Sequence, residues 1–498
     1  MAVNTSLRSI EPKQFGYEQA QHLLNRVGFG GPPRQVSALV DMGLRRAVDH
    51  LVDFESLDTS DLPRPSVDPD VLRPPTDEQR QLLRRARREK SEQILAKFRA
   101  QRRESQRADR RQIRQLRRWW LSRMIATTQP LEEKLTLMWH GHFATNYRTV
   151  RDCYLMLQQQ SLLRRNAIGS FADLVLGIIH DPAMIRFLDN HNNRKQNPNE
   201  NLARELMELF TLGEGNYAEA DIKEGARALT GYSFHDNDFV FHRHMHDAGA
   251  KQILGRRGRF DGDQFARILL EQKACPRFVS YRLYKHFVAD VEYDQLANAP
   301  GVRRVIDRMA RLVVRHKYRI RPVLKVLFRS MHFYDQTIVG NKIKSPAQLL
   351  VGTVRMLNLP VPDLEKLVDA MRLMGQTLFD PPSVAGWAGG RSWINTSTLF
   401  VRQNLCAFLI TGKRSGDRRW TTSPIGYDPM FLVKNLPTQS HEAVVDHLLK
   451  IMLVGQVPLH RRAQVLAFVQ QRHNGELKVA ALLDLLLLVT AMPEYQLC

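Results

Sequence analysis

The feature that most constrains this fold is the segment of residues 76–127, which contains neither glycine nor proline. The segment is rich in Arg, Gln, Glu, Leu and Ala, all of which favour the α-helix. We therefore predict one long helix over residues 77–128, which would reach roughly 75 Å at 1.5 Å per residue. Its apolar residues gather at its two ends, so its middle is predicted to cross solvent.

The positive charge of the chain is concentrated in the same segment. The sequence has 73 Lys and Arg against 51 Asp and Glu, a net charge of +22. Residues 84–118 hold 15 basic and four acidic residues, so they supply +11 of this excess. Two interpretations stay open. The segment is either a solvated arm, or a surface that binds a polyanion or an anionic membrane with Trp119 and Trp120 as an apolar wedge.

The remaining sequence predicts a mainly α-helical protein, because helical spacing of apolar residues recurs from Tyr17 to the C-terminal region. Alternation typical of strands is confined to residues 232–241, which predict one small β-hairpin. No apolar run reaches the 18 residues of a membrane span. The four cysteines are far apart and form no Cys-x-x-Cys pair, so neither a cysteine zinc site nor a disulfide framework is predicted.

Composition divides the chain into successive parts around one large helical domain and a basic arm. They are N-terminal helices of the main domain (1–57), a Pro- and Asp-rich linker (58–76), the long basic helix (77–128), the main helical domain (129–380), and a Gly/Trp-rich loop with C-terminal helices (381–498). The N-terminus shows no apolar leader, which predicts a cytoplasmic protein.

Candidate chemistry lies between Trp139 and Lys251. In the predicted helix of residues 199–212, helical projection places the polar residues on one arc of about 140°. Glu200, Arg204 and Glu208 would form an i,i+4 ladder of ordinary surface ion pairs. Glu205 stands outside that ladder, and with Glu208 it is predicted to share a proton or bind a divalent cation.

Histidines supply two further candidate groups. His140 and His142 flank Gly141, where the preceding helix is expected to fray; in an extended turn both could face one metal ion. His246 and Asp247 follow the predicted hairpin and form the second group. A zinc, manganese or iron site is one interpretation, and purely structural histidines are the other.

Other residues are candidates for substrate binding. Arg204 and Lys251 would hold an anionic substrate, and Asn201 lies on the same polar arc as Arg204. Trp387, in the glycine-rich loop of residues 381–395, would face a sugar or an aromatic ligand. Packing of its ring against the helical core is the alternative interpretation.

Several motifs carry a resemblance to a known family. They are Trp139–Phe143, the block 199–213, and the segments 226–231, 246–251 and 381–387. With these motifs in the family's order, the chain resembles the bacterial family called domain of unknown function 1800. The resemblance extends from His22 to Gln496. The resemblance implies no particular reaction. Its members often carry export signals and are often encoded beside proteins resembling sulfatases, which implies export as an alternative location and a sulfatase-like protein as a partner.

Three functions follow as hypotheses. The first is a hydrolase-like enzyme with a metal or acid/base site, in which Glu205, Glu208, His246 and Asp247 act on an anionic substrate. The second is a non-catalytic binding or assembly protein that uses the basic arm. The third is a nucleic-acid-binding protein.

Overall fold

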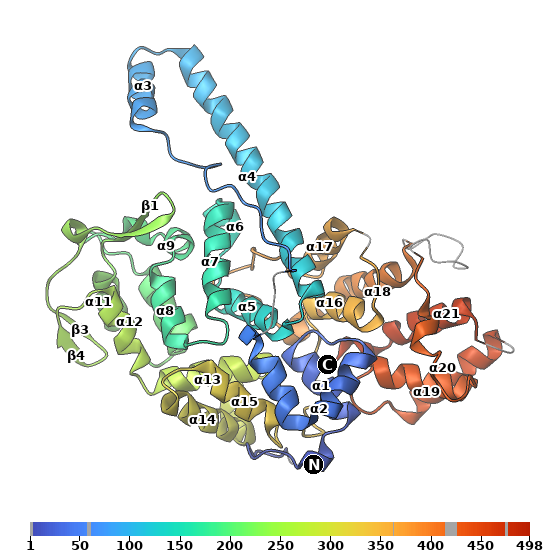
Figure 1. Cartoon of the computed structure of the whole chain (residues 1–498). Helices are drawn as coiled ribbons and strands as arrows, with labels where there is room; N and C mark the ends of the chain where they lie inside the picture. Colours follow the sequence, from blue (N-terminus) through green and yellow to red (C-terminus); the bar gives the residue numbers. More distant parts are fainter. Residues whose placement is uncertain (1–2, 57–60, 362, 414–425, 474–476) are drawn as a thin grey trace.

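The structure is a computed structural model that describes residues 3–56, 61–361, 363–413, 426–473 and 477–498. Its described residues form helices α1 to α21 and two small antiparallel sheets of two strands each, so the prediction of a mainly α-helical protein is confirmed. Within the described residues, no helix combines the length and the apolar character needed to cross a membrane. Figure 1 shows a broad helical body from which α3 and α4 project.

The body has two hydrophobic cores that share α5 and α7. The helices of the first core are α1 (Tyr17–Val27), α2 (Pro33–Val52, broken at Gly43), α5 (Pro130–His142), α7 (Cys153–Arg165), α8 (Phe171–Ile179), α9 (Pro182–Phe187), α10 (Asn201–Glu205), α11 (Glu219–Ala228), α12 (Gly262–Leu270), α13 (Ala274–Phe287), α14 (Pro300–Arg315) and α15 (Ile320–Arg329).

The second core lies on the other side of α5. It is built by the short α6 (Tyr147–Val150), α16 (Pro346–Leu357), α17 (Leu364–Leu373), α18 (Thr396–Thr411), α19 (His441–Met452), α20 (Leu459–Arg472) and α21 (Val479–Ala491), with the inner end of the arm. The two cores meet along α5, so segments that are far apart in sequence line the space between them.

The arm is a helical hairpin, and the prediction of one continuous helix is wrong. It consists of α3 (Asp77–Arg88) and α4 (Glu92–Ala126), and the chain reverses between them at Lys90, whose φ is 52°. The reversal lets Ala86 pack fully buried against α4. The helix-forming residues of this segment are compatible with two shorter helices as well as with one long helix. The reversal requires a single left-handed residue, and Lys90 adopts this conformation although it is neither glycine nor proline.

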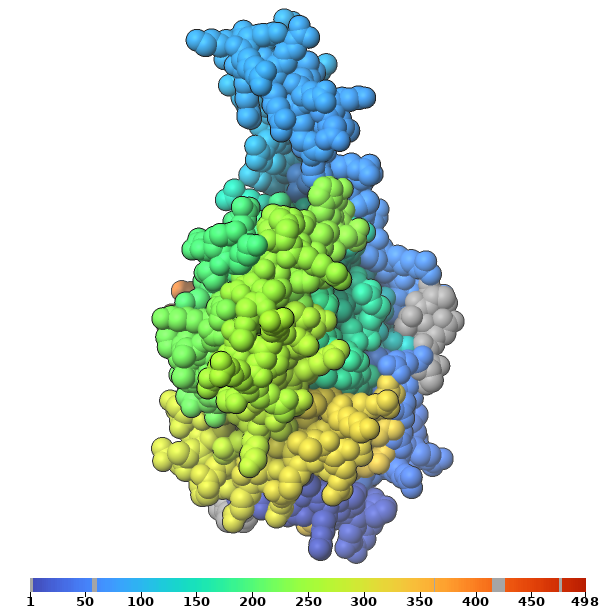
Figure 2. Space-filling view, turned by 90° about the vertical axis from the view of Figure 1, so that its left-hand side faces the viewer, coloured from blue at the N-terminus to red at the C-terminus, as the bar shows by residue number. Residues whose placement is uncertain are grey.

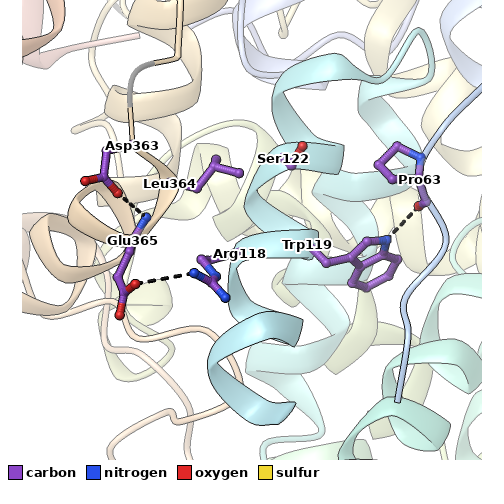
Figure 3. Close-up of a pocket in the computed structure, with 7 residues that line it drawn as sticks. All are labelled: Pro63, Arg118, Trp119, Ser122, Asp363, Leu364 and Glu365. Carbon is purple, nitrogen blue, oxygen red and sulfur yellow. Dashed lines mark hydrogen bonds and ion pairs between the residues drawn. The ribbon is translucent and has the colours of Figure 1, made fainter. Parts of the chain in front are cut away.

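The two tryptophans anchor the arm, and the predicted apolar wedge is wrong for Trp120. Trp120 is fully buried, and its Nε1 donates to Glu133 Oε2 at 2.9 Å. Trp119 is half-buried, and its Nε1 donates to the carbonyl oxygen of Pro63 at 2.6 Å. Figure 3 shows this contact beside a cavity of about 380 Å³ between α4 and α17, closed by the Arg118–Glu365 ion pair.

The described residues form two β-hairpins, whereas the sequence predicted one. β1 (Tyr232–His235) pairs with β2 (Asp238–Phe241), which confirms the prediction. The second, β3 (Lys251–Ile253) with β4 (Arg256–Gly258), was not predicted. Its turn residues Leu254 and Gly255 both have positive φ, as a two-residue hairpin turn requires. Leucine rarely adopts this conformation, so Gly255 was the one turn signal that the sequence carried there.

Candidate functional site

A cavity of about 740 Å³ lies between the two cores. Its walls come from α5, α13, the π-helical turn η4 (Leu206–Thr211), the segment 342–348 and the loop 385–393. These segments are distant in sequence and are brought together by the packing of both cores around α5. We refer to this cavity as the central pocket. Its volume falls in the range of small-molecule sites.

A pair of glycines allows the loop to close the central pocket. Gly386 has φ +80°, and a Cβ atom on it would lie 2.0 Å from the carbonyl oxygen of Gly141. A Cβ on Gly141 would in turn lie 3.2 Å from the ring of Trp387. The loop therefore rests directly on α5, and Trp387 both lines the pocket and packs against His140. This position fits both interpretations of Trp387, so its role in ligand binding stays a prediction.

Two of the cations around the pocket are held by the protein itself. Arg26 donates to the carbonyl oxygens of Val288 and Ile338. Lys134 donates to the carbonyl oxygen of Gly28 at 2.6 Å and also to Gln348. Burial lowers the pKa of Lys134 to about 7. These groups join the first core to the second and have few donors left for a ligand.

Three other basic side chains at the pocket, Arg282, Lys342 and His286, make fewer hydrogen bonds to described residues than Arg26 and Lys134 do. Arg282 makes no hydrogen bond or ion pair with any residue that the structure describes, although burial lowers its pKa. Lys342 donates only to the carbonyl oxygen of Lys285, at 2.7 Å. The Nε2 of His286 is buried and has no partner within the described part of the chain.

The same three groups influence one another electrostatically. The pKa of His286 is held well below its usual value by burial and then by the charges of Lys134, Lys342 and Arg282. Burial also lowers the pKa of Lys342 to about 8. The nearby carboxylate of Glu292 is paired with Lys285 at 2.7 Å. These cations repel one another, but the carboxylates of Glu208, Glu214, Asp290, Glu292 and Asp294 line the same pocket and offset part of their charge.

Carboxylates lie on the π-helical wall. Glu208 lines the pocket and accepts a hydrogen bond from Tyr217 Oη at 2.7 Å. Glu205 is half-buried one turn earlier, and its pKa is raised to about 7 by burial and then by the charge of Glu208. The Glu205 carboxyl therefore gives up its proton near neutral pH rather than in acid.

The predicted ladder on this wall is only half correct. Arg204 pairs with Glu200 at 3.0 Å, but its second partner is Glu219 at 2.6 Å rather than Glu208. The π-helical geometry of residues 206–211 shifts Glu208 out of the α-helical register. Asn201, at the exposed start of α10, and Arg204 do not line the central pocket.

The predicted metal ligands His140 and His142 lie inside α5, so the expected fraying before His142 is wrong. Each is 1% exposed. His140 packs against Trp120, and the Nε2 of His142 donates to the carbonyl oxygen of Phe210 at 3.0 Å. In the described part of the chain, no three His, Cys, Asp or Glu side chains are grouped to hold a metal ion. Metal ligation by this pair stays a prediction without a ligand set to support it.

The predicted group around His246 and Asp247 forms a closed network at α11 and β3. Asp247 accepts a hydrogen bond from Arg227 Nε at 2.7 Å, and Lys251 donates to the carbonyl oxygen of Asp247 at 2.5 Å. The Nδ1 of His246 donates to the carbonyl oxygen of Thr230 at 2.9 Å. None of these residues lines the central pocket. Glu208 thus lines the central pocket, whereas His246 and Asp247 do not.

Comparison with known proteins identifies the family of the chain. The family described as "Protein of unknown function (DUF1800)" has a model that matches residues 22–497. The chain belongs to the DUF1800 family. No curated protein and no solved structure matches it. The matched residues include the arm, most of both cores and the lining of the central pocket apart from Cys498.

Sequence reasoning missed the cations of this DUF1800 pocket. Phe278, Tyr281, Arg282, Lys285 and His286 all line it and follow one another at helical spacing on one face of α13. A helix face that mixes aromatic rings with cations differs from an ordinary apolar face. This pattern was the sequence signal that could have indicated the pocket. Lys342 lies outside any helix or strand and carried no local signal.

Proposed function

We propose that this protein binds a small organic anion in the central pocket and acts on it as a hydrolase-like enzyme. Arg282 and Lys342 hold the anionic group, and Glu208 takes part as the acid/base carboxylate, with Glu205 behind it. The observation that carries the proposal is Arg282, which lines a cavity of about 740 Å³ and makes no hydrogen bond or ion pair with a described residue, although the charge of Glu292 acts on it.

The energetic argument concerns desolvation. Arg282 is half-buried, so its guanidinium has lost part of its hydration without gaining a hydrogen bond to a described residue, and this loss costs free energy. A carboxylate, phosphate or sulfate ester would accept its parallel N–H donors. Phe278, Tyr281 and Trp387 line the same cavity, so an anion that also has an apolar part fits better than a simple inorganic ion.

Binding is tested with the full-length protein by calorimetry and thermal unfolding, with inorganic phosphate and benzoate as probes. We expect the anion to raise the unfolding temperature, and Arg282→Met to abolish this effect. Lys273→Met is the control, since Lys273 is exposed just before α13 and does not line the pocket. Equal anion binding by both variants would overturn the anion site.

The reaction is tested separately with nitrophenyl esters of phosphate, sulfate and simple carboxylic acids. We expect Glu208→Gln to lose turnover while it keeps anion binding, because a carboxamide cannot accept the proton. If no ester is hydrolysed by a protein that still binds anions, the hydrolase-like reaction is excluded for these substrates and the pocket is a binding site only.

A further inference from the structure

The arm is held rigidly in one direction. Besides Trp119 and Trp120, the buried carboxylate of Asp109 accepts a hydrogen bond from Tyr147 Oη at 2.6 Å and another from the backbone N–H of Cys153 at 2.8 Å. Arg117 donates to the carbonyl oxygen of Leu378 at 2.9 Å. Beyond these contacts the hairpin projects alone from the body, as Figures 1 and 2 show.

A row of exposed arginines runs along α4, from its projecting part into the part that packs against the body. It consists of Arg99, Arg103, Arg107, Arg110 and Arg114, all exposed. At 100° per residue they fall within an arc of about 80°, and at 1.5 Å per residue they extend over roughly 22 Å. The acidic residues of this stretch, Glu104 and Asp109, lie outside that arc. We call these five residues the arginine row.

Most of the arginine row has no partner in the protein. Arg103, Arg110 and Arg114 make no ion pair with any residue that the structure describes, and Arg107 reaches Glu104 only at 4.0 Å. Arg99 is the exception, because it pairs with Glu92 at 2.6 Å. Like charges at i,i+4 destabilise a helix, so this arrangement lowers the stability of the arm rather than raising it.

The chemistry of the row distinguishes between possible partners. Among the large apolar side chains of the arm, Leu82 is the markedly exposed one, at 44%, and it lies on α3 rather than in the row. Insertion into a membrane surface needs an apolar face beside the cations. Stable protein interfaces need aromatic or aliphatic anchors. A polar, strongly cationic surface without such anchors is typical of contacts with a phosphodiester backbone.

We propose that the arginine row docks along the phosphate backbone of a nucleic acid. Guanidinium groups spaced three or four residues apart along a straight helix meet successive phosphates, and each can bind one of them through two N–H donors. The contacts read no base, so binding is independent of sequence. This proposal does not depend on the central pocket.

The test measures binding of the full-length protein to a short fluorescent DNA duplex by anisotropy over a range of salt concentrations. The variant replaces Arg103, Arg110 and Arg114 by Gln. A matched control replaces Arg304, Arg311 and Arg315 by Gln. These three are also exposed, make no ion pair with described residues and share one face of α14. Both variants lose the same charge, and circular dichroism checks that both are folded.

We expect the arm variant to bind the duplex at least about tenfold more weakly than the control. We also expect its plot of log affinity against log salt to be shallower by about 2.7, or about 0.9 for each lost phosphate contact. Equal affinities of the two variants would overturn the proposal. So would the absence of duplex binding by the wild type at low salt. Tighter binding to phosphatidylserine vesicles or to polyglutamate than to the duplex would assign the row to a membrane or an acidic protein instead.

Discussion

The network around Arg227 and the central pocket around Arg282 contain the same kinds of side chain but differ in where their partners are. Arg227 pairs with Asp247 at 2.7 Å and with Glu224 at 2.8 Å. Arg282 makes no hydrogen bond or ion pair with a described residue, although the charge of Glu292 acts on it. The first region is complete within the protein, whereas in the proposed function an anion completes the second. A cluster of polar residues is therefore a candidate site only where its donors are left unsatisfied.

The largest effect expected from this comparison is on stability. Asp247→Ala removes two hydrogen bonds to Arg227 and one to the backbone N–H of Gly249. We expect a loss of about 3 kcal/mol in the free energy of unfolding, because Arg227 keeps its charge but loses a partner. Denaturant unfolding measures it.

Arg282→Met is the counterpart in the pocket. It should leave the free energy of unfolding unchanged or slightly higher, because the replacement removes a charge that has no partner. If Arg282→Met destabilised the protein as much as Asp247→Ala, then Arg282 would have a structural role and the two regions would not differ.

The second prediction concerns the loop that closes the pocket. Gly386→Ala should cost about 2 kcal/mol and abolish the anion-dependent rise in unfolding temperature, because the added Cβ would collide with Gly141 and displace Trp387. Gly215→Ala is the control for backbone strain alone. Gly215 also has φ +80°, but a Cβ there meets nothing within 4 Å. Equal losses in both variants would show that the loop does not depend on contact with α5.

The third prediction is a pH dependence of opposite sign in the two regions. The pKa of Glu205 is raised to about 7 from its usual 4.5, so its contribution to stability is present below pH 4.5 and is lost as the pH rises through 7. The hydrogen bond from Arg227 instead lowers the pKa of Asp247, whose contribution is present at neutral pH and is lost in acid.

The matching experiment compares Glu205→Gln with the wild type at pH 5 and pH 8. We expect the variant to be more stable by about 1–2 kcal/mol at pH 8 and nearly equal at pH 5, after allowance for the partial exposure of Glu205. Equal differences at both pH values would mean that Glu205 does not titrate between them.

Sequence periodicity predicted most helices well, because they bury one apolar face. The spacing of apolar residues predicts helices over Tyr17–Val27 and Phe171–Ile179, which are the bounds of α1 and α8. The failures share a local cause. Lys90 and Leu254 adopt the left-handed conformation although their residue types rarely do, and only Gly255 marks the turn at Leu254. The π-helical turn at residues 206–211 moves Glu208 out of α-helical register and has no distinctive residue type.

The central pocket was less predictable than the fold for a different reason. Glu208 and Trp387 were named from the sequence, but the cations opposite them come from α13 and from Lys342. Only the packing of two cores around α5 brings these segments together. Moreover, the sequence shows which residues can donate hydrogen bonds, but it does not show which donors find acceptors inside the fold.

The smallest effect is expected at Arg204, which the sequence predicted to hold the substrate. Arg204 is 37% exposed and pairs with Glu200 and Glu219 on the surface. Because exposed ion pairs contribute little, Arg204→Gln should change the free energy of unfolding by about 0.5 kcal/mol or less.

The same variant should leave the rise in unfolding temperature with phosphate or benzoate unchanged, because its guanidinium does not line the central pocket. Thermal unfolding of Arg204→Gln beside Arg282→Met measures both effects in one series. If Arg204→Gln lost the anion effect and Arg282→Met kept it, the anion would bind at the polar face of α10, and the unpartnered guanidinium of the pocket would have to be explained without a ligand.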